Sequence, residues 1–107
     1  MPKFIFTAAA ALLLAACAGQ RSAHESDAPR LTVQSPGIVA ALADARRPAE
    51  DTAHDAARHA AETLAFGDIR PGARVGEILP GGGYYTRLLA IAVGESGRVY
   101  PVVRPEA

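Results

Sequence analysis

The sequence predicts an α/β protein in which N-terminal helices are followed by one βαβ unit, the opening portion of a parallel sheet. Three observations predict this class. Apolar residues recur at helical spacing between residues 36 and 66. Two short β-type segments follow at 74–79 and 98–103. A glycine-rich turn and a further helical stretch lie between these two segments.

The first 16 residues have the order of a secretory signal peptide. Lys3 supplies a positive charge, residues 4–16 are an uncharged apolar run, and small residues surround Cys17. The run is 13 residues long, well short of the roughly 20 residues that a membrane-spanning helix needs. We therefore exclude residues 1–16 from the fold.

The stretch "LAAC", residues 14–17, resembles the bacterial lipoprotein signal box. In that family the cysteine becomes the lipid-modified first residue of the mature chain, and several acyl chains anchor it because one chain alone is marginal. The resemblance implies a membrane-anchored protein of the cell envelope that faces the periplasm. By resemblance to known lipoproteins, Ala18 rather than an aspartate after the cysteine favours sorting to the outer membrane. The alternative is ordinary cleavage after Ala18, with Ala16 and Ala18 as the small pair.

Cys17 is the only cysteine of the chain, and the formal net charge is zero. A lone cysteine excludes internal disulfides and a cysteine-cluster metal site. We expect no metal site and no nucleic-acid partner. Residues 17–35 are interpreted as the lipid-anchor cysteine and a flexible polar tether, because residues 18–35 lack periodicity and apolar content. Residues 36–107 remain for a partial α/β domain, small enough that a single core is marginal by itself.

A first helix is predicted to begin at residue 36. Ser35 can cap it, Pro36 suits the first helical position, and Ile38, Val39 and Leu42 repeat at helical spacing.

A second helix is predicted over residues 49–66, after Pro48. One apolar stripe runs along this helix, made up of Ala53, Ala56, Ala57, Ala60, Ala61, Leu64 and Ala65. Its charged residues Asp55, Arg58 and Glu62 have spacings suited to ordinary surface ion pairs.

The first predicted strand, 74–79, is largely apolar, as expected for a strand covered on both faces. After the glycines, a helix is predicted over residues 84–93, with an inner face formed by Leu88, Leu89, Ala92 and Val93. The segment 98–103 completes the βαβ unit.

The glycine turn does not fit two common nucleotide-binding motifs. Gly76 and Gly81 have the spacing of a phosphate-binding loop, but Gly82 and Gly83 stand where lysine and serine or threonine are needed. The dinucleotide-binding motif needs a glycine where Thr86 stands.

The stretch "VGEILPGGG", residues 75–83, resembles the first motif of class I S-adenosylmethionine-dependent methyltransferases, hydrophobic-x-(Asp/Glu)-hydrophobic-Gly-x-Gly-x-Gly. The matching residues are Val75, Glu77, Ile78, Gly81 and Gly83, whereas Leu79 replaces the first glycine of the family. Residues 36–107 resemble more particularly the amino-terminal part of a group of bacterial predicted methyltransferases. The specific piece of that resemblance is "PGGGYYTR", residues 80–87.

The resemblance implies a Rossmann-like methyltransferase sheet and S-adenosylmethionine as the cofactor. The cofactor-binding residues that it implies are Glu77, Pro80, Gly81, Gly82, Gly83 and Tyr84. Glu77 would meet the ammonium group of the cofactor, and the helix after Gly83 would offer backbone N–H groups to its carboxylate. Methyl transfer depends mainly on alignment, so no catalytic residue is assigned. The alternative is a plain strand-to-helix turn in which Glu77 is a solvated charge.

The resemblance covers only the front end of such an enzyme. The family has a seven-stranded sheet and an acidic residue after the second strand, where Val103 stands here and Glu106 lies three residues later. We therefore expect a methyltransferase-like exported lipoprotein that is truncated to its cofactor-proximal portion, inactive alone, and open to a partner chain that completes the sheet. The alternative function is a small lipid-anchored interaction module of the envelope without enzymatic activity.

Overall fold

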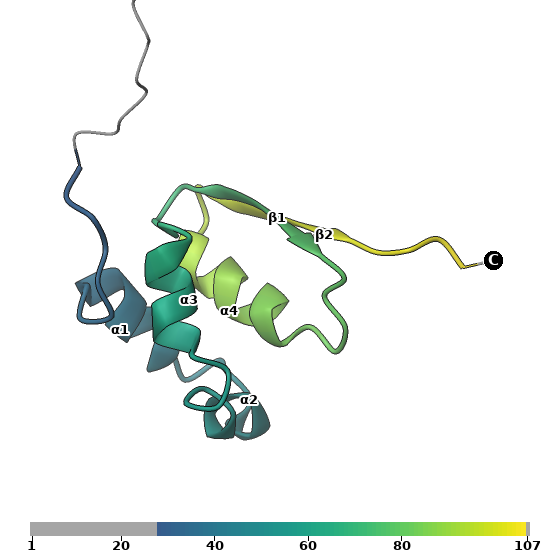
Figure 1. Ribbon diagram of the computed structural model, residues 1–107, viewed down its shortest axis with the longest axis horizontal. Helices are drawn as coiled ribbons and strands as arrows, with labels where there is room; N and C mark the ends of the chain where they lie inside the picture. The colour runs from purple at the N-terminus through teal and green to yellow at the C-terminus, as the bar shows by residue number, and fades with distance from the viewer. Residues whose placement is uncertain (1–27, 107) are drawn as a thin grey trace, which may run out of the picture.

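The computed structural model describes residues 28–106. The predictions for the signal peptide, for Cys17 and for residues 18–27 of the tether lie outside this range. Within it, four helices and a two-stranded parallel sheet form a small mixed α/β domain (Figure 1). The elements are α1 (Pro36–Leu42), α2 (Ala49–Ala53), α3 (Ala60–Phe66), β1 (Arg74–Ile78), α4 (Tyr84–Val93) and β2 (Arg98–Val102). None of the helices in this range has the length and apolar character needed to cross a membrane.

Strands β1 and β2 are parallel neighbours joined by α4, as the sequence predicts. Arg74 lies opposite Arg98 at one end of the ladder, and Ile78 lies opposite Val102 at the other. Helix α4 packs against both strands, and all four helices lie on the same side of the sheet (Figure 1).

Only one face of the sheet is covered within residues 28–106. Val75 and Glu77 of β1 are half-buried, whereas Gly76 and Ile78 are exposed, with Ile78 retaining 78% of its accessible surface. The prediction that β1 is covered on both faces is therefore wrong for this part of the chain. The reason is that α4 packs on the face of Val75 and Glu77, and the other described helices lie on the same side of the sheet.

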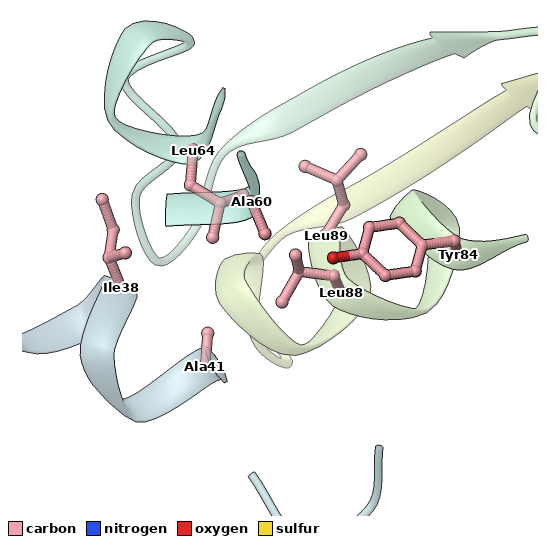
Figure 2. Packing of buried hydrophobic residues seen from close by; sticks show 7 residues of the cluster. All are labelled: Ile38, Ala41, Ala60, Leu64, Tyr84, Leu88 and Leu89. Atoms are coloured by element: carbon pink, nitrogen blue, oxygen red, sulfur yellow. The ribbon is translucent and has the colours of Figure 1, made fainter. Parts of the chain in front are cut away.

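The core forms where α1, α3 and α4 meet (Figure 2). Its buried members are Ile38 and Ala41 from α1, Ala60 and Leu64 from α3, and Tyr84, Leu88 and Leu89 from α4. Burying a leucine-sized side chain contributes about 1.5–3 kcal/mol, so these few residues stabilise the three helices together. Helix α2 contributes no apolar side chain to this cluster.

The segment predicted as one helix over 49–66 is two short helices. Helix α2 ends at Ala53, and α3 begins at Ala60 after His59, which adopts a left-handed conformation with φ 49°. Ala60 is buried, but Ala53, Ala56 and Ala57 of the predicted stripe are exposed. Alanine methyl groups offer little apolar area, so they do not determine how this segment packs.

The described part of the tether, residues 28–35, lies against the domain. Leu31 packs on the core, and Arg70 Nη2 donates a hydrogen bond of 2.5 Å to the carbonyl oxygen of Pro29. Ser35 occupies the N-cap position of α1, but its hydroxyl does not cap the helix. It accepts instead from the amide of Thr32 at 2.9 Å, so the predicted capping hydrogen bond is not formed.

Candidate ligand pocket at the glycine turn

The turn between β1 and α4 needs glycine at two of its positions. Gly81 has φ 56° and Gly83 has φ 82°, in the left-handed region that glycine adopts without steric cost. The amide of Gly83 donates to the carbonyl oxygen of Pro80 at 3.0 Å and closes the turn. Leu79 also has a positive φ, 56°, while its amide continues the sheet ladder to the carbonyl oxygen of Val102.

The backbone conformation at position 82 does not require glycine. Its φ lies outside the left-handed region, and an added Cβ would meet no atom within 4 Å. Within residues 28–106, the amides of Gly81 and Gly82 donate no hydrogen bond. The absence of a side chain at Gly82 therefore leaves exposed main chain facing open space.

A pocket of about 430 Å³ lies over this turn, beyond the carboxyl end of β1. In open α/β sheets, ligands bind in crevices outside the carboxyl ends of the strands. Three parts of the chain line the pocket: the turn (Leu79, Pro80, Gly81, Gly82), the region from α2 to α3 (Glu50, Asp51, His54, Arg58) and the start of α4 (Tyr84, Arg87). The structure thus brings Pro80, Gly81, Gly82 and Tyr84 of the predicted site together.

Glu77 lies apart from this pocket. It lines a neighbouring groove of about 380 Å³ together with Phe66 and Tyr85, and Leu79 and Pro80 line both hollows. Its Oε2 accepts a hydrogen bond of 2.5 Å from the hydroxyl of Thr86. This bond ties β1 to the first turn of α4. Gly83, the N-cap residue of α4, lines neither hollow.

Helix α4 begins without a capping side chain, because its N-cap residue is Gly83. The first turn of a helix carries backbone N–H groups without intrahelical acceptors, and the helix dipole places partial positive charge there. These groups, with the amides of the turn, make the carboxyl end of β1 suited to an anionic group.

An ion pair joins α2 to α4 at the rim of the pocket. Arg87 Nε donates to Asp51 Oδ2 at 2.7 Å, and Arg87 Nη2 donates to Asp51 Oδ1 at 2.8 Å. Arg87 Nη1 also donates to the carbonyl oxygen of Gly82 at 2.9 Å. The hydrogen bonds from Arg87 hold the pKa of Asp51 below its usual value, although burial of this carboxylate acts in the opposite direction. One guanidinium thus connects α2, the turn and α4.

A second ion pair lies directly behind Tyr84. Arg47, whose side chain is fully buried, donates to Asp55 Oδ2 and Oδ1 at 2.7 and 2.6 Å. The hydroxyl of Tyr84 donates to Asp55 Oδ1 at 2.5 Å. Burial, with the hydrogen bond to Asp55 as the second cause, raises the pKa of Tyr84 to about 12. The hydrogen bonds from Arg47 lower the pKa of Asp55.

The interpretation of Asp55 and Arg58 as members of ordinary surface ion pairs is wrong. Asp55 pairs with Arg47, eight residues earlier, and Arg58 instead stacks on the ring of Tyr84, with 4.6 Å between the guanidinium carbon and the ring centroid. Spacings of three or four residues give no signal for this pair, because Asp55 lies beyond the end of α2 and its partner is eight residues away.

No protein family model matches the chain, and no curated protein or solved structure is significantly similar to it. In the described part of the chain, no three histidine, cysteine, aspartate or glutamate side chains are grouped so that they could hold a metal ion. The function is therefore argued from the pocket and its polar walls.

Proposed function

We propose that this domain is the cofactor-proximal, Rossmann-like portion of a methyltransferase-like protein, and that its glycine turn contacts S-adenosylmethionine. The observation that carries the proposal is the pocket over the bare main chain of Gly81 and Gly82 at the carboxyl end of β1. Its volume of about 430 Å³ falls within the range of roughly 300–1,000 Å³ typical of small-molecule sites.

The chemistry of the pocket suits the amino-acid end of that cofactor. The amides of Gly81 and Gly82 and the start of α4 favour its carboxylate. Glu77 lies in the adjoining groove, beyond Leu79 and Pro80. An elongated ligand that crosses Leu79 and Pro80 would therefore reach both the glycines and the carboxylate of Glu77. Such a ligand would supply a sulfonium methyl group, and this chain would bind and orient it.

Binding by these residues alone is expected to be weak, with a Kd in roughly the millimolar range. The sheet of the described residues has two strands, and no residue that lines the pocket is assigned to an acceptor site. We accordingly expect no methyl transfer by the chain alone.

The test is equilibrium dialysis with labelled S-adenosylmethionine. The protein is the full-length chain carrying Cys17→Ser, purified in mild detergent. Gly82→Val should lower the affinity by roughly tenfold or more, because the new side chain enters the pocket without backbone strain. Gly37→Val is the matched control, since Gly37 is equally open and unstrained but lines neither this pocket nor the adjoining groove. Equal binding by wild type and Gly82→Val would contradict the proposal, as would a complete lack of binding at millimolar cofactor.

The second candidate function is an envelope interaction module without enzymatic activity. The observation that favours it is the uncovered apolar face of the sheet, where Ile78, Tyr100 and Val102 retain 78%, 46% and 53% of their accessible surface. Exposed apolar patches of this kind commonly mark contact surfaces. If this second function is correct, none of the three proteins should bind the cofactor in the dialysis experiment.

We also propose that Cys17 is lipid-modified and holds the domain at the periplasmic side of an envelope membrane, favouring the outer membrane. The support is the sequence "LAAC", residues 14–17. Bacteria that express the chain and are fed a labelled fatty acid should incorporate label into wild type and not into Cys17→Ser. Wild type should also sediment with membranes. Label in both proteins, or in neither, is the result that excludes lipidation at this cysteine.

A further inference from the structure

Residues 49–59, which connect α1 to α3 and include α2, have no apolar anchor. Every side chain in this range is exposed except two, Asp51, which is buried, and Asp55, which is half-buried. The segment is therefore not held down by the hydrophobic core described above.

Polar contacts hold the segment instead. Asp51 pairs with Arg87 of α4, and Asp55 pairs with Arg47 and accepts from Tyr84 of α4. We call these two carboxylates and their partners the carboxylate latch. Near the end of the segment, the hydroxyl of Tyr85 donates to the carbonyl oxygen of Arg58 at 2.7 Å. Every side-chain hydrogen bond between this segment and α4 is thus made at the latch or at Arg58.

The backbone of the segment is suited to move as a unit. Pro48 precedes it, and His59 ends it in a left-handed conformation, with φ 49° and ψ 49°. Helix α2 has five residues, far fewer than an isolated helix needs to be stable in water. Without the latch, little in its own sequence would keep it folded in place.

The same segment forms one wall of the pocket at the glycine turn. Glu50, Asp51, His54 and Arg58 line the pocket opposite Gly81 and Gly82. We infer that residues 49–59 are a lid over this pocket, closed by the carboxylate latch and able to open while the core of α1, α3 and α4 stays folded. The role of the lid in ligand access depends on the proposed function, whereas its opening does not.

Loss of the ion pair between Asp51 and Arg87 should let the lid open without unfolding the domain. Arg87 retains 41% of its side-chain accessible surface, so it can turn to water when its partner carboxylate is lost. Arg47 is fully buried, so a change at Asp55 would leave a buried charge unpaired and threaten the fold. Asp51→Asn is therefore the informative variant.

The experiment is hydrogen–deuterium exchange by mass spectrometry on the full-length Cys17→Ser chain in mild detergent, without ligand. In this protein, amides of residues 49–59 should exchange faster than those of 60–66 and 88–93, because local opening costs less than global unfolding. Asp51→Asn should raise exchange in 49–59 by roughly tenfold or more, since the charge-assisted hydrogen bonds between Asp51 and Arg87 are weakened. Exchange in the two core segments should stay the same.

Asp44→Asn is the matched control. Asp44 also pairs with an arginine, Arg46, at 2.7 Å, but neither side chain is hydrogen-bonded to the lid and neither residue lines the pocket. This variant should leave exchange in 49–59 unchanged. Equal protection of the lid and the core in the parent protein would overturn the inference, and so would a uniform rise of exchange across the whole domain in Asp51→Asn. Because no cofactor is present, failure here is distinct from failure of the proposed function.

Discussion

Among residues 28–106, Leu79 has the backbone conformation that fits its side chain least well. A bulky residue at φ 56° has its Cβ close to the carbonyl oxygen, which costs roughly 1–2 kcal/mol for an L-residue. Strain of this kind concentrates at binding sites and switch regions, held by the surrounding structure. Here the hydrogen bond from Leu79 to Val102 and the turn at Pro80 hold it, directly beside the pocket.

The strain at Leu79 predicts an unusual order of stability among variants. Leu79→Gly should be more stable than Leu79→Ala by about 1 kcal/mol, because alanine keeps the Cβ that is strained at positive φ. The side chain is 60% exposed, so both variants lose little packing and the comparison isolates the backbone. Urea unfolding followed by circular dichroism measures the difference. An alanine variant as stable as the glycine variant would mean that the backbone relaxes at this position.

The sequence predicted the residues of the turn but not the residues that face them. Pro80, Gly81, Gly82 and Tyr84 are contiguous or nearly so, so one motif captures them. Arg47 precedes α2 and Asp55 follows it, and the two form an ion pair. A search for partners three or four residues apart along one helix does not detect this pair.

At the scale of secondary-structure elements, prediction succeeded where apolar spacing is strong. Helix α4 and the strands β1 and β2 lie within a residue or two of the predicted ranges because leucine, isoleucine and valine recur in these segments. It failed between residues 49 and 66, where the stripe is mostly alanine. There the packing is decided by Asp51 and Asp55 with partners elsewhere in the chain.

The same distinction separates the two walls of the pocket. The wall formed by the turn can be predicted from local sequence, because glycines directly after a strand indicate a turn with positive φ angles. The opposite wall, which includes His54 and Arg58, depends on where the chain turns between α2 and α3. That turn is governed by tertiary contacts, so local periodicity does not reveal it.

At the scale of the whole domain, apolar and polar contacts stabilise different halves. The apolar cluster of Figure 2 unites α1, α3 and α4, whereas carboxylates and arginines fix α2 and the entrance to α3. Carboxylate contacts depend on pH and apolar contacts do not, so acid should weaken the two halves unequally.

The stability of the domain should therefore fall at acidic pH. The hydrogen bonds from Arg87 and Arg47 hold the pKa values of Asp51 and Asp55 below the ordinary value, which in an unfolded chain is about 3.9. A group whose pKa is lowered by folding contributes stability above its unfolded pKa, and that contribution is lost as pH falls through its folded pKa. The hydrogen bond from the Arg46 side chain lowers the pKa of Asp44 to about 2, so the contribution of this group is lost as the pH falls toward that value.

The urea midpoint of the parent protein should accordingly be level between pH 7 and 5 and fall steadily below about pH 4. Asp51→Asn should start from a lower midpoint at pH 7 and show a shallower fall, because one of the titrating carboxylates is gone. Midpoints measured by circular dichroism between pH 7 and 2.5 test both statements. A parent protein whose midpoint is the same at pH 5 and pH 2.5 would show that these carboxylates are equally easy to protonate folded and unfolded, and that α2 is held by contacts other than its ion pairs.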